Sequence, residues 1–167
     1  MGSEIALHQY PVELVGVTMD WLMTPMHMLD DSEELATAVR VALGTDARSD
    51  DDEILPDPDS YDQRGWWGNF EAEDIWGGWP IGCKNWLLTR AKISDEVSWE
   101  GATVQRAHAY TYEAMRPFID NGIASEVYVK AARRGRSEID VYVTLYRGPL
   151  PAIELRYAYL WEQVITG

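Results

Sequence analysis

The spacing of apolar residues changes along the chain, from helical in the middle to alternating in the last third. One helix is predicted from Asp31 and Ser32, which are good N-cap residues, to Gly44, where glycine favours a stop. A longer helix is predicted over residues 96–121, and a short one precedes it over residues 81–92. In each segment apolar side chains recur every three or four residues, which predicts one buried face.

The last third of the chain alternates apolar and polar residues, as a half-buried strand does. The pattern covers residues 126–130, 138–147 and 152–159, with a basic turn at 133–137 between the first two runs. Three consecutive antiparallel strands form a meander, whose outer edge can accept a strand from another chain. With short strands expected within residues 5–21, the predicted class is α+β: two or three helices packed on a small antiparallel sheet with a C-terminal three-stranded meander.

Length and composition predict a single globular domain spanning residues 1–167. The chain is 46% hydrophobic and 25% charged, which is ordinary for a globular protein with one core. Residues 45–64 are rich in aspartate and proline, which predicts a solvated acidic loop because adjacent carboxylates repel and proline lacks an N–H. Asp57, Asp59 and Asp62 do not have the spacing of a calcium-binding loop, so a solvated loop is favoured over a cation site.

Negative charge is concentrated in the first half. Residues 1–80 contain 18 acidic and 3 basic residues, whereas residues 81–167 contain 10 acidic and 11 basic ones. A formal charge of -14 argues against nucleic-acid binding, because phosphate contacts need clustered Lys and Arg. No run reaches the roughly 18–20 apolar residues of a membrane span, and the N-terminus lacks signal-peptide features. We therefore expect a cytoplasmic protein with no membrane insertion.

Tryptophans and glycines are interspersed directly after the acidic loop. The four tryptophans are Trp66, Trp67, Trp76 and Trp79. Such a segment is either an aromatic platform for a ligand or a compact cap packed on the core. Two alternative functions follow: a peptidoglycan glycoside hydrolase, or a carbohydrate-binding module that stacks sugars on the indoles. The hydrolase would use paired carboxylates beside the indoles, at Glu71, Glu73 and Asp74.

Two further expectations concern single residues. Arg64 or Arg90 is predicted to hold the acidic loop against the tryptophan-rich segment, because an arginine can bind carboxylates bidentately. Cys83, the single cysteine, cannot form an intramolecular disulfide and is expected to be a small buried thiol. None of these patterns implies a cofactor.

A specific series of motifs runs through residues 33–147: GTDARSDDD, RGWWG, G..NWLL.R.K and NGIASEVYV. In this order they resemble the Mu-like phage baseplate family of tail-baseplate wedge proteins. More distant relatives of that family are the lysozyme-like-named wedge proteins of contractile tails and the sheath-initiating subunit of type VI secretion. The family pattern falls on Asp46, Arg48, Asp51, Asp52, Arg64, Gly65, Trp66, Trp67, Gly68, Gly82, Trp86, Leu87, Leu88, Arg90 and Lys92.

The resemblance implies a structural protein of the virion tail baseplate, not an enzyme, assembled in the host cytoplasm in multiple copies around the tail axis. Its implied partners are other wedge proteins, the tail sheath protein and hub or tube proteins. Its implied role is to join the wedge to the hub and tube region and to initiate the sheath on an exposed sheet edge. That edge is expected at Ile139, Val141, Val143, Leu145, Tyr146, Ile153, Leu155, Tyr157 and Tyr159, the last four within a C-terminal strand extension at 149–167.

Overall fold

The computed structural model describes the chain in five stretches, residues 7–11, 17–21, 34–91, 103–134 and 138–160. The chain divides into two compact units, residues 1–41 and residues 42–167. Among the helices in these stretches, none combines the length and the apolar character that a membrane crossing requires.

The first unit contains a pair of antiparallel strands, as the sequence predicts for residues 5–21. Strand β1 (Leu7–Pro11) pairs with β2 (Val17–Trp21), with Leu7 opposite Trp21. Helix α1 (Glu34–Gly44) begins in this unit and ends at the predicted glycine, beyond the boundary between the units. The predicted N-cap residues Asp31 and Ser32 lie outside the described residues.

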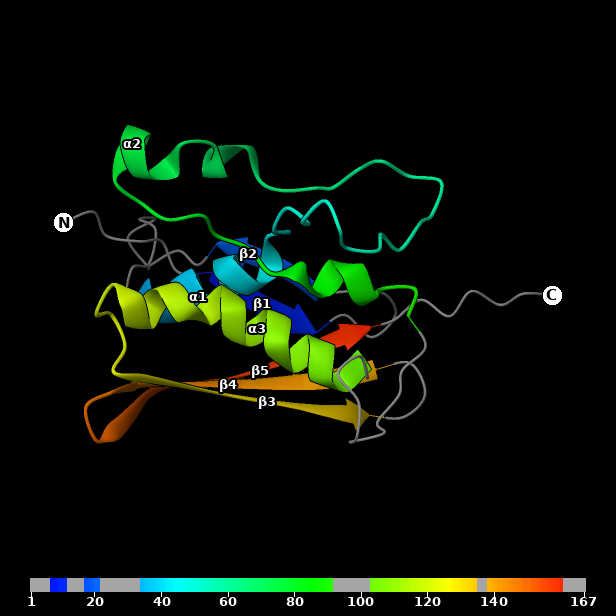
Figure 1. Cartoon of the computed structure of the whole chain (residues 1–167). Coiled ribbons are helices and arrows are strands. Elements are labelled where there is room, and N and C mark those ends of the chain that lie inside the picture. The colour runs from blue at the N-terminus through cyan, green and yellow to red at the C-terminus, as the bar shows by residue number, and fades with distance from the viewer. Residues whose placement is uncertain (1–6, 12–16, 22–33, 92–102, 135–137, 161–167) are drawn as a thin grey trace. The chain divides into compact units, whose positions relative to one another are not determined.

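The second unit is built on an antiparallel sheet with the strand order β3-β4-β5 (Figure 1). Its strands are β3 (Glu126–Arg134), β4 (Glu138–Arg147) and β5 (Leu150–Leu160). Val143 of β4 lies opposite Val129 on one side and Leu155 on the other, so β4 is the central strand. The backbone turns into β5 at Gly148, where φ is 77°. Together the helices and antiparallel strands confirm the predicted α+β class.

Helix α3 (Thr103–Asp120) covers one face of this sheet and packs on β3 and β4. Its buried residues recur every three or four positions, so the helix has one buried face. They are Thr103, Ala107, Thr111, Met115 and Phe118, of which Ala107 and Met115 belong to the apolar face that the sequence predicted. The helix ends at the predicted position, where Gly122 has a φ of 69° and donates its N–H to the carbonyl of Ile119 at 2.9 Å.

Between α1 and α3, the described residues 45–91 contain three short helical segments. They are the 3₁₀ helix η1 (Trp67–Asn69), the helix α2 (Ala72–Trp76) and the 3₁₀ helix η2 (Lys84–Leu88). The segment η2 packs on α3, and Asn85 donates its side-chain amide to the hydroxyl of buried Thr111 at 3.0 Å. Figure 1 shows η1 and α2 on the side of α3 away from the sheet.

Candidate functional site

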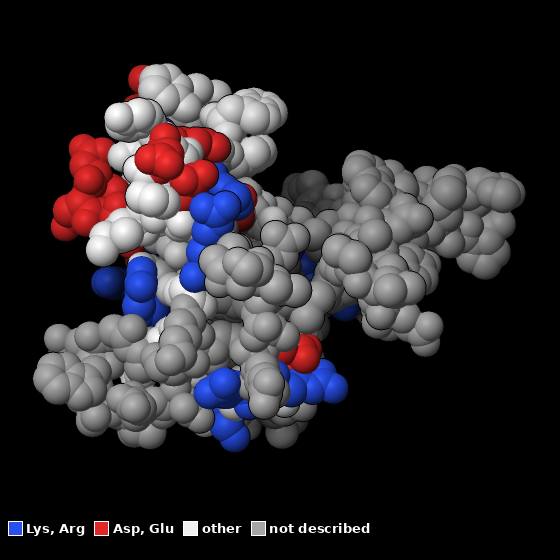
Figure 2. Space-filling view, turned by 90° about the vertical axis from the view of Figure 1, so that its right-hand side faces the viewer, with Lys and Arg blue, Asp and Glu red and all other residues white. Residues whose placement is uncertain are grey.

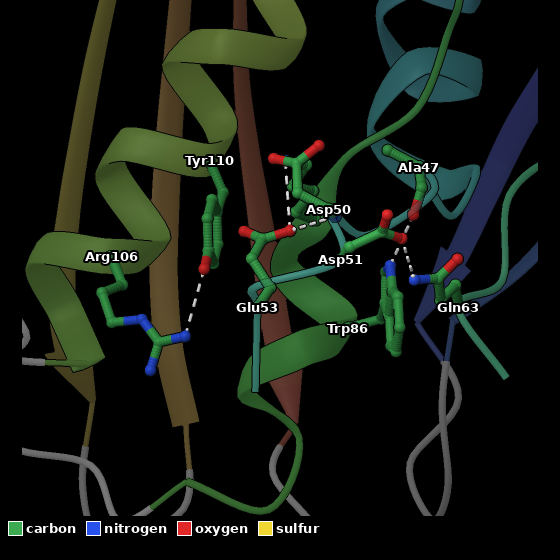
Figure 3. Close-up of polar contacts among 9 residues, drawn as sticks. Ala47, Asp50, Asp51, Glu53, Gln63, Trp86, Arg106 and Tyr110 are labelled. Atoms are coloured by element: carbon green, nitrogen blue, oxygen red, sulfur yellow. Dashed lines mark hydrogen bonds and ion pairs between the residues drawn. The ribbon is translucent and has the colours of Figure 1, made fainter. Parts of the chain in front are cut away.

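The acidic loop, residues 45–64, is closed across its base by hydrogen bonds. The N–H of Ser49 donates to the carbonyl of Gln63 at 3.0 Å. The Gln63 side-chain amide donates to Asp51 Oδ1 at 2.8 Å (Figure 3), and Arg48 donates to the amide oxygen of Gln63. These bonds join the beginning of the loop to its end.

Arg64 connects this loop to η2. Its Nη1 lies 2.7 Å from Asp46 Oδ2, and its guanidinium carbon lies 4.7 Å from the centre of the Trp86 ring, within the range of a cation–π contact. Trp86 is buried and donates its indole N–H to the carbonyl of Ala47 at 2.8 Å (Figure 3). Arg64 thus contacts the loop and η2, whereas the sequence predicted that it would hold the loop against the tryptophan-rich segment.

Lys84 is the most buried cation that contacts the loop. Its side chain is 12% exposed, and its Nζ lies 2.6 Å from Asp50 Oδ2 and 3.2 Å from Glu53 Oε2. Burial by itself lowers the pKa of Lys84, but the hydrogen bonds to Asp50 and Glu53, with the nearby charge of Glu113, outweigh it and raise that pKa well above its ordinary value. Lys84 therefore stays charged and holds two carboxylates of the loop against η2.

Arg90 contributes a weaker contact. Its Nη1 lies 3.7 Å from Asp57 Oδ1, with both side chains about half exposed, and an exposed pair of this kind adds little stability. The matched position Lys92 lies outside the described residues. The sequence analysis did not identify Lys84 as a partner of the loop. The signal was its place directly before the buried run Asn85–Leu88, where a lysine needs carboxylate partners.

Close backbone approach explains the glycines around the loop. The N–H of Cys83 donates to the carbonyl of Thr45 at 2.8 Å, and the N–H of Ala47 donates to the carbonyl of Cys83 at 3.2 Å. A Cβ on Gly82, whose φ is 132°, would lie 2.7 Å from the backbone nitrogen of Ala47. A Cβ on Gly65 would lie 3.0 Å from the Cβ of Arg48. Cys83 itself is buried, as expected.

The tryptophan-rich cap, defined as residues 66–80, is tied to the rest of the unit by side chains. Trp66 covers buried Gly68, where an added Cβ would lie 2.3 Å from the indole ring. Asn69 donates its side-chain amide to the carbonyl of Ile81 at 2.6 Å and accepts the N–H of Ile81 at 2.8 Å. The ring of Trp79 meets that of Phe118 on α3 edge to face at 6.1 Å.

The cap combines the two predicted possibilities, a packed cap and an aromatic platform, with different side chains in each role. Trp66 and Trp79 pack inward, whereas Trp67 and Phe70 are exposed. The segment is therefore a packed cap that also presents aromatic surface.

The sheet separates the expected edge residues into two groups. The first group lies on β4, the central strand. Within it Tyr146 is half-buried, and the other four side chains are fully buried: Ile139, Val141, Val143 and Leu145. The others lie on β5, an outer strand of the described sheet, in register with β4: Ile153, Leu155, Tyr157 and Tyr159. Of the expected edge residues, those on β5 therefore lie on an outer strand of the described sheet, whereas the four buried β4 residues belong to the core.

Comparison with known proteins identifies the family. A family model described as phage protein GP46 matches residues 35–149. The baseplate protein gp46 of Escherichia phage Mu is 36% identical over 118 residues, which are 71% of this chain and 72% of the phage Mu protein. The chain belongs to the phage protein GP46 family. The resemblance to the Mu-like phage baseplate family is thereby confirmed.

The match to the GP46 family spans the loop, the cap, α3 and the first two strands of the sheet. Strand β5 begins at Leu150, directly after the matched residues, so arguments about β5 rest on this chain's own sequence. The candidate glycosidase carboxylates lie in the matched region, on the cap.

These carboxylates, Glu71, Glu73 and Asp74, are all exposed at the surface of this GP46 family member. A glycosidase acid is instead enclosed in an apolar pocket, which the exposed positions do not provide.

Proposed function

We propose that this chain is a structural component of a phage tail baseplate that joins the wedge to the hub and tube region and initiates the sheath. The observation that carries the proposal is strand β5, which pairs with β4 on one side and is an outer strand of the described sheet. Membership of the GP46 family and the likeness to a phage Mu baseplate protein support the baseplate role. No catalytic step is needed for it.

Strand β5 suits strand addition better than β3, the other outer strand. An edge is protected from pairing by charges, above all lysine, and by proline. Strand β3 carries four charged residues in nine, including Lys130, whereas β5 carries two in eleven, Glu154 and Arg156, with Pro151 next to its first residue. Strand β5 has 11 residues, of which about half point their N–H and C=O groups away from β4. Each backbone bond to an incoming strand would contribute about 0.5–1.5 kcal/mol, so several bonds can hold a sheath strand.

The buried residues of β4 have a supporting role in this proposal. Ile139, Val141, Val143 and Leu145 fix β4 on the core, and its register with β5 fixes where the outer strand lies. An edge held in one position lowers the entropy cost of adding a strand.

Partners of several kinds follow from the proposed role. The partners are the tail sheath protein at the β5 edge, other wedge proteins, and hub or tube proteins. Multiple copies would stand around the tail axis, since closed rotational symmetry is the rule for such assemblies. The chain would act as one domain of the virion baseplate, assembled in the host cytoplasm.

A pair of adjacent proline substitutions tests the edge. Successive residues of a strand point their backbone groups to opposite sides, so one of Leu155→Pro and Arg156→Pro removes a donor facing β4 and the other removes a donor at the free edge. Leu155→Ala and Arg156→Ala are the controls for side-chain loss. Thermal unfolding identifies the inward proline, because losing a ladder bond costs at least about 1 kcal/mol more than the matched alanine.

The edge proline is then the informative variant. In cells where it replaces the native chain, it should keep the stability of its alanine control while sheathed tails, counted by electron microscopy, disappear. Normal sheathed tails from a folded edge-proline variant would refute sheath initiation at β5.

A further inference from the structure

Exposed apolar side chains are concentrated in one part of the chain. The five most exposed large apolar side chains that the structure describes all lie between residues 54 and 75, with exposures from 67% to 97%. They are Ile54, Tyr61, Trp67, Phe70 and Ile75. Single exposed apolar residues are common on surfaces, but a concentration of large ones marks an interaction site.

The backbone holds two of these rings outward on the same side. Trp67 and Phe70 are three residues apart in a 3₁₀ turn, where the N–H of Phe70 donates to the carbonyl of Trp67 at 3.2 Å. Side chains three apart in such a turn are aligned. Behind them, Asn69 bonds to the backbone of Ile81 at both its amide atoms, and Gly68 is buried. The exposed rings are therefore presented by an anchored segment.

Negative charge is concentrated in the part of the chain that carries these rings. Residues 45–80 contain 11 acidic and 2 basic residues, and Figure 2 shows carboxylates gathered around uncharged residues on this part of the surface. The loop carboxylates Asp46 and Asp50 are paired with cations. The cap carboxylates Glu71, Glu73 and Asp74 are exposed and form no ion pair with a described residue. The segment that presents the exposed rings thus also carries uncompensated negative charge.

We propose that residues 67–75 are a docking surface for a basic protein partner, whose apolar pocket ringed by Lys or Arg receives Trp67 and Phe70. Charge complementarity selects this occupant, because the partner supplies the cations that Glu71, Glu73 and Asp74 lack. A second copy of this chain is disfavoured by its formal charge of -14, and a nucleic acid is disfavoured by like charge.

This docking surface is separate from the proposed β5 edge. The cap lies on the side of α3 away from the sheet (Figure 1), and both belong to the second unit. Both surfaces can therefore be occupied at once, which lets one copy of the chain connect two different neighbours.

Site-specific photo-crosslinking tests the proposal in cells that make the chain together with its native neighbours. The photo-reactive residue p-benzoylphenylalanine replaces Trp67, and in a control chain it replaces Tyr128 on β3. Crosslinked peptides are then identified by mass spectrometry. The charge requirement is tested in the same chain with Glu71→Lys, Glu73→Lys and Asp74→Lys together, against the single charge reversal Asp120→Lys elsewhere. Milder Glu71→Gln, Glu73→Gln and Asp74→Asn changes cover the case in which the triple reversal does not fold.

The expected product at position 67 is a crosslink to a segment of another protein that is rich in Lys or Arg and in apolar residues. The triple reversal should lower its yield by about tenfold or more, the milder triple variant by a smaller factor, and Asp120→Lys should leave it unchanged. Three results would overturn the proposal: no protein crosslink at position 67, a crosslink to this chain itself, or a yield that the folded triple variants do not lower.

Discussion

Lys84 offers the sharpest test of how the acidic loop is held. In Lys84→Met the aliphatic part of the side chain remains, but the ammonium between Asp50 and Glu53 is lost. Glu53 is then left with an uncompensated charge at 18% exposure, whereas Asp50, at 68% exposure, returns to water at little cost. The loss therefore comes mainly from the contact with Glu53.

The size of the effect follows from that geometry. Breaking a fully buried ion pair costs about 3–5 kcal/mol, and an exposed pair contributes about 0–1 kcal/mol. With one buried partner and one exposed partner, we expect Lys84→Met to lower the free energy of unfolding by about 2 kcal/mol. For a chain of this size, that corresponds to a fall of about 4–8 °C in the melting temperature.

Urea unfolding monitored by tryptophan fluorescence measures the effect, with Arg90→Met as the matched control. Because the Arg90–Asp57 contact is long and exposed, the control should lose less than about 1 kcal/mol. A double-mutant cycle of Lys84→Met with Glu53→Gln should show coupling of about 1 kcal/mol or more. Equal losses for the two single variants, together with no coupling, would refute the role assigned to Lys84.

The pH dependence follows from the raised pKa of Lys84. A lysine whose pKa is higher in the folded state stabilises the fold fully at pH values below its unfolded pKa of about 10.4. That stabilisation is lost as the pH rises through the folded value. The difference in unfolding free energy between native chain and Lys84→Met should thus be constant from about pH 7 to 9.5 and shrink at more alkaline pH.

Three further predictions concern the cap, the loop and the sheet. Asn69→Ala removes both bonds to Ile81 and should cost about 1–3 kcal/mol in urea unfolding, with faster proteolysis within the cap; an unchanged cleavage rate would contradict the anchoring. Gly82→Ala should lower the free energy of unfolding more than Gly77→Ala, because a Cβ on Gly82 would lie 2.7 Å from a backbone atom whereas one on Gly77 has nothing within 4 Å. Equal losses of stability in calorimetry would argue against close packing at Gly82. Leu145→Ala should cost about 2–5 kcal/mol because its side chain is fully buried, whereas a residue acting only in partner contact would leave the isolated protein's stability unchanged.

Local patterns in the sequence were enough to predict most of the regular structure. The helical spacing of Ala107 and Met115 depends on neighbouring residues, as does the stop at Gly122. The alternation in β4 likewise revealed which residues would share a buried face. Such signals act over a few residues and are independent of what the rest of the chain does.

The residues that hold the loop were harder to predict, because their partners are distant in sequence. Lys84 contacts Asp50 and Glu53, more than 30 residues earlier, and no periodicity records that pairing. The two amide bonds of Asn69 to Ile81 were missed for the same reason. The 3₁₀ helix η2 (Lys84–Leu88) stands in place of the short helix predicted over residues 81–92, which cannot begin before Gly82 because that residue adopts a φ of 132° to pass the backbone of Ala47.

The sequence by itself determined the α+β class, the acidic character of one half and, through its motifs, the GP46 family. Only the tertiary structure decided that β4 is the central strand, that Trp66 packs while Trp67 is exposed, and that Lys84 is buried between carboxylates. The physical reason is the range of the forces involved. Local backbone preferences depend on neighbouring residues, whereas burial and ion pairing depend on which distant parts of the chain the fold brings together.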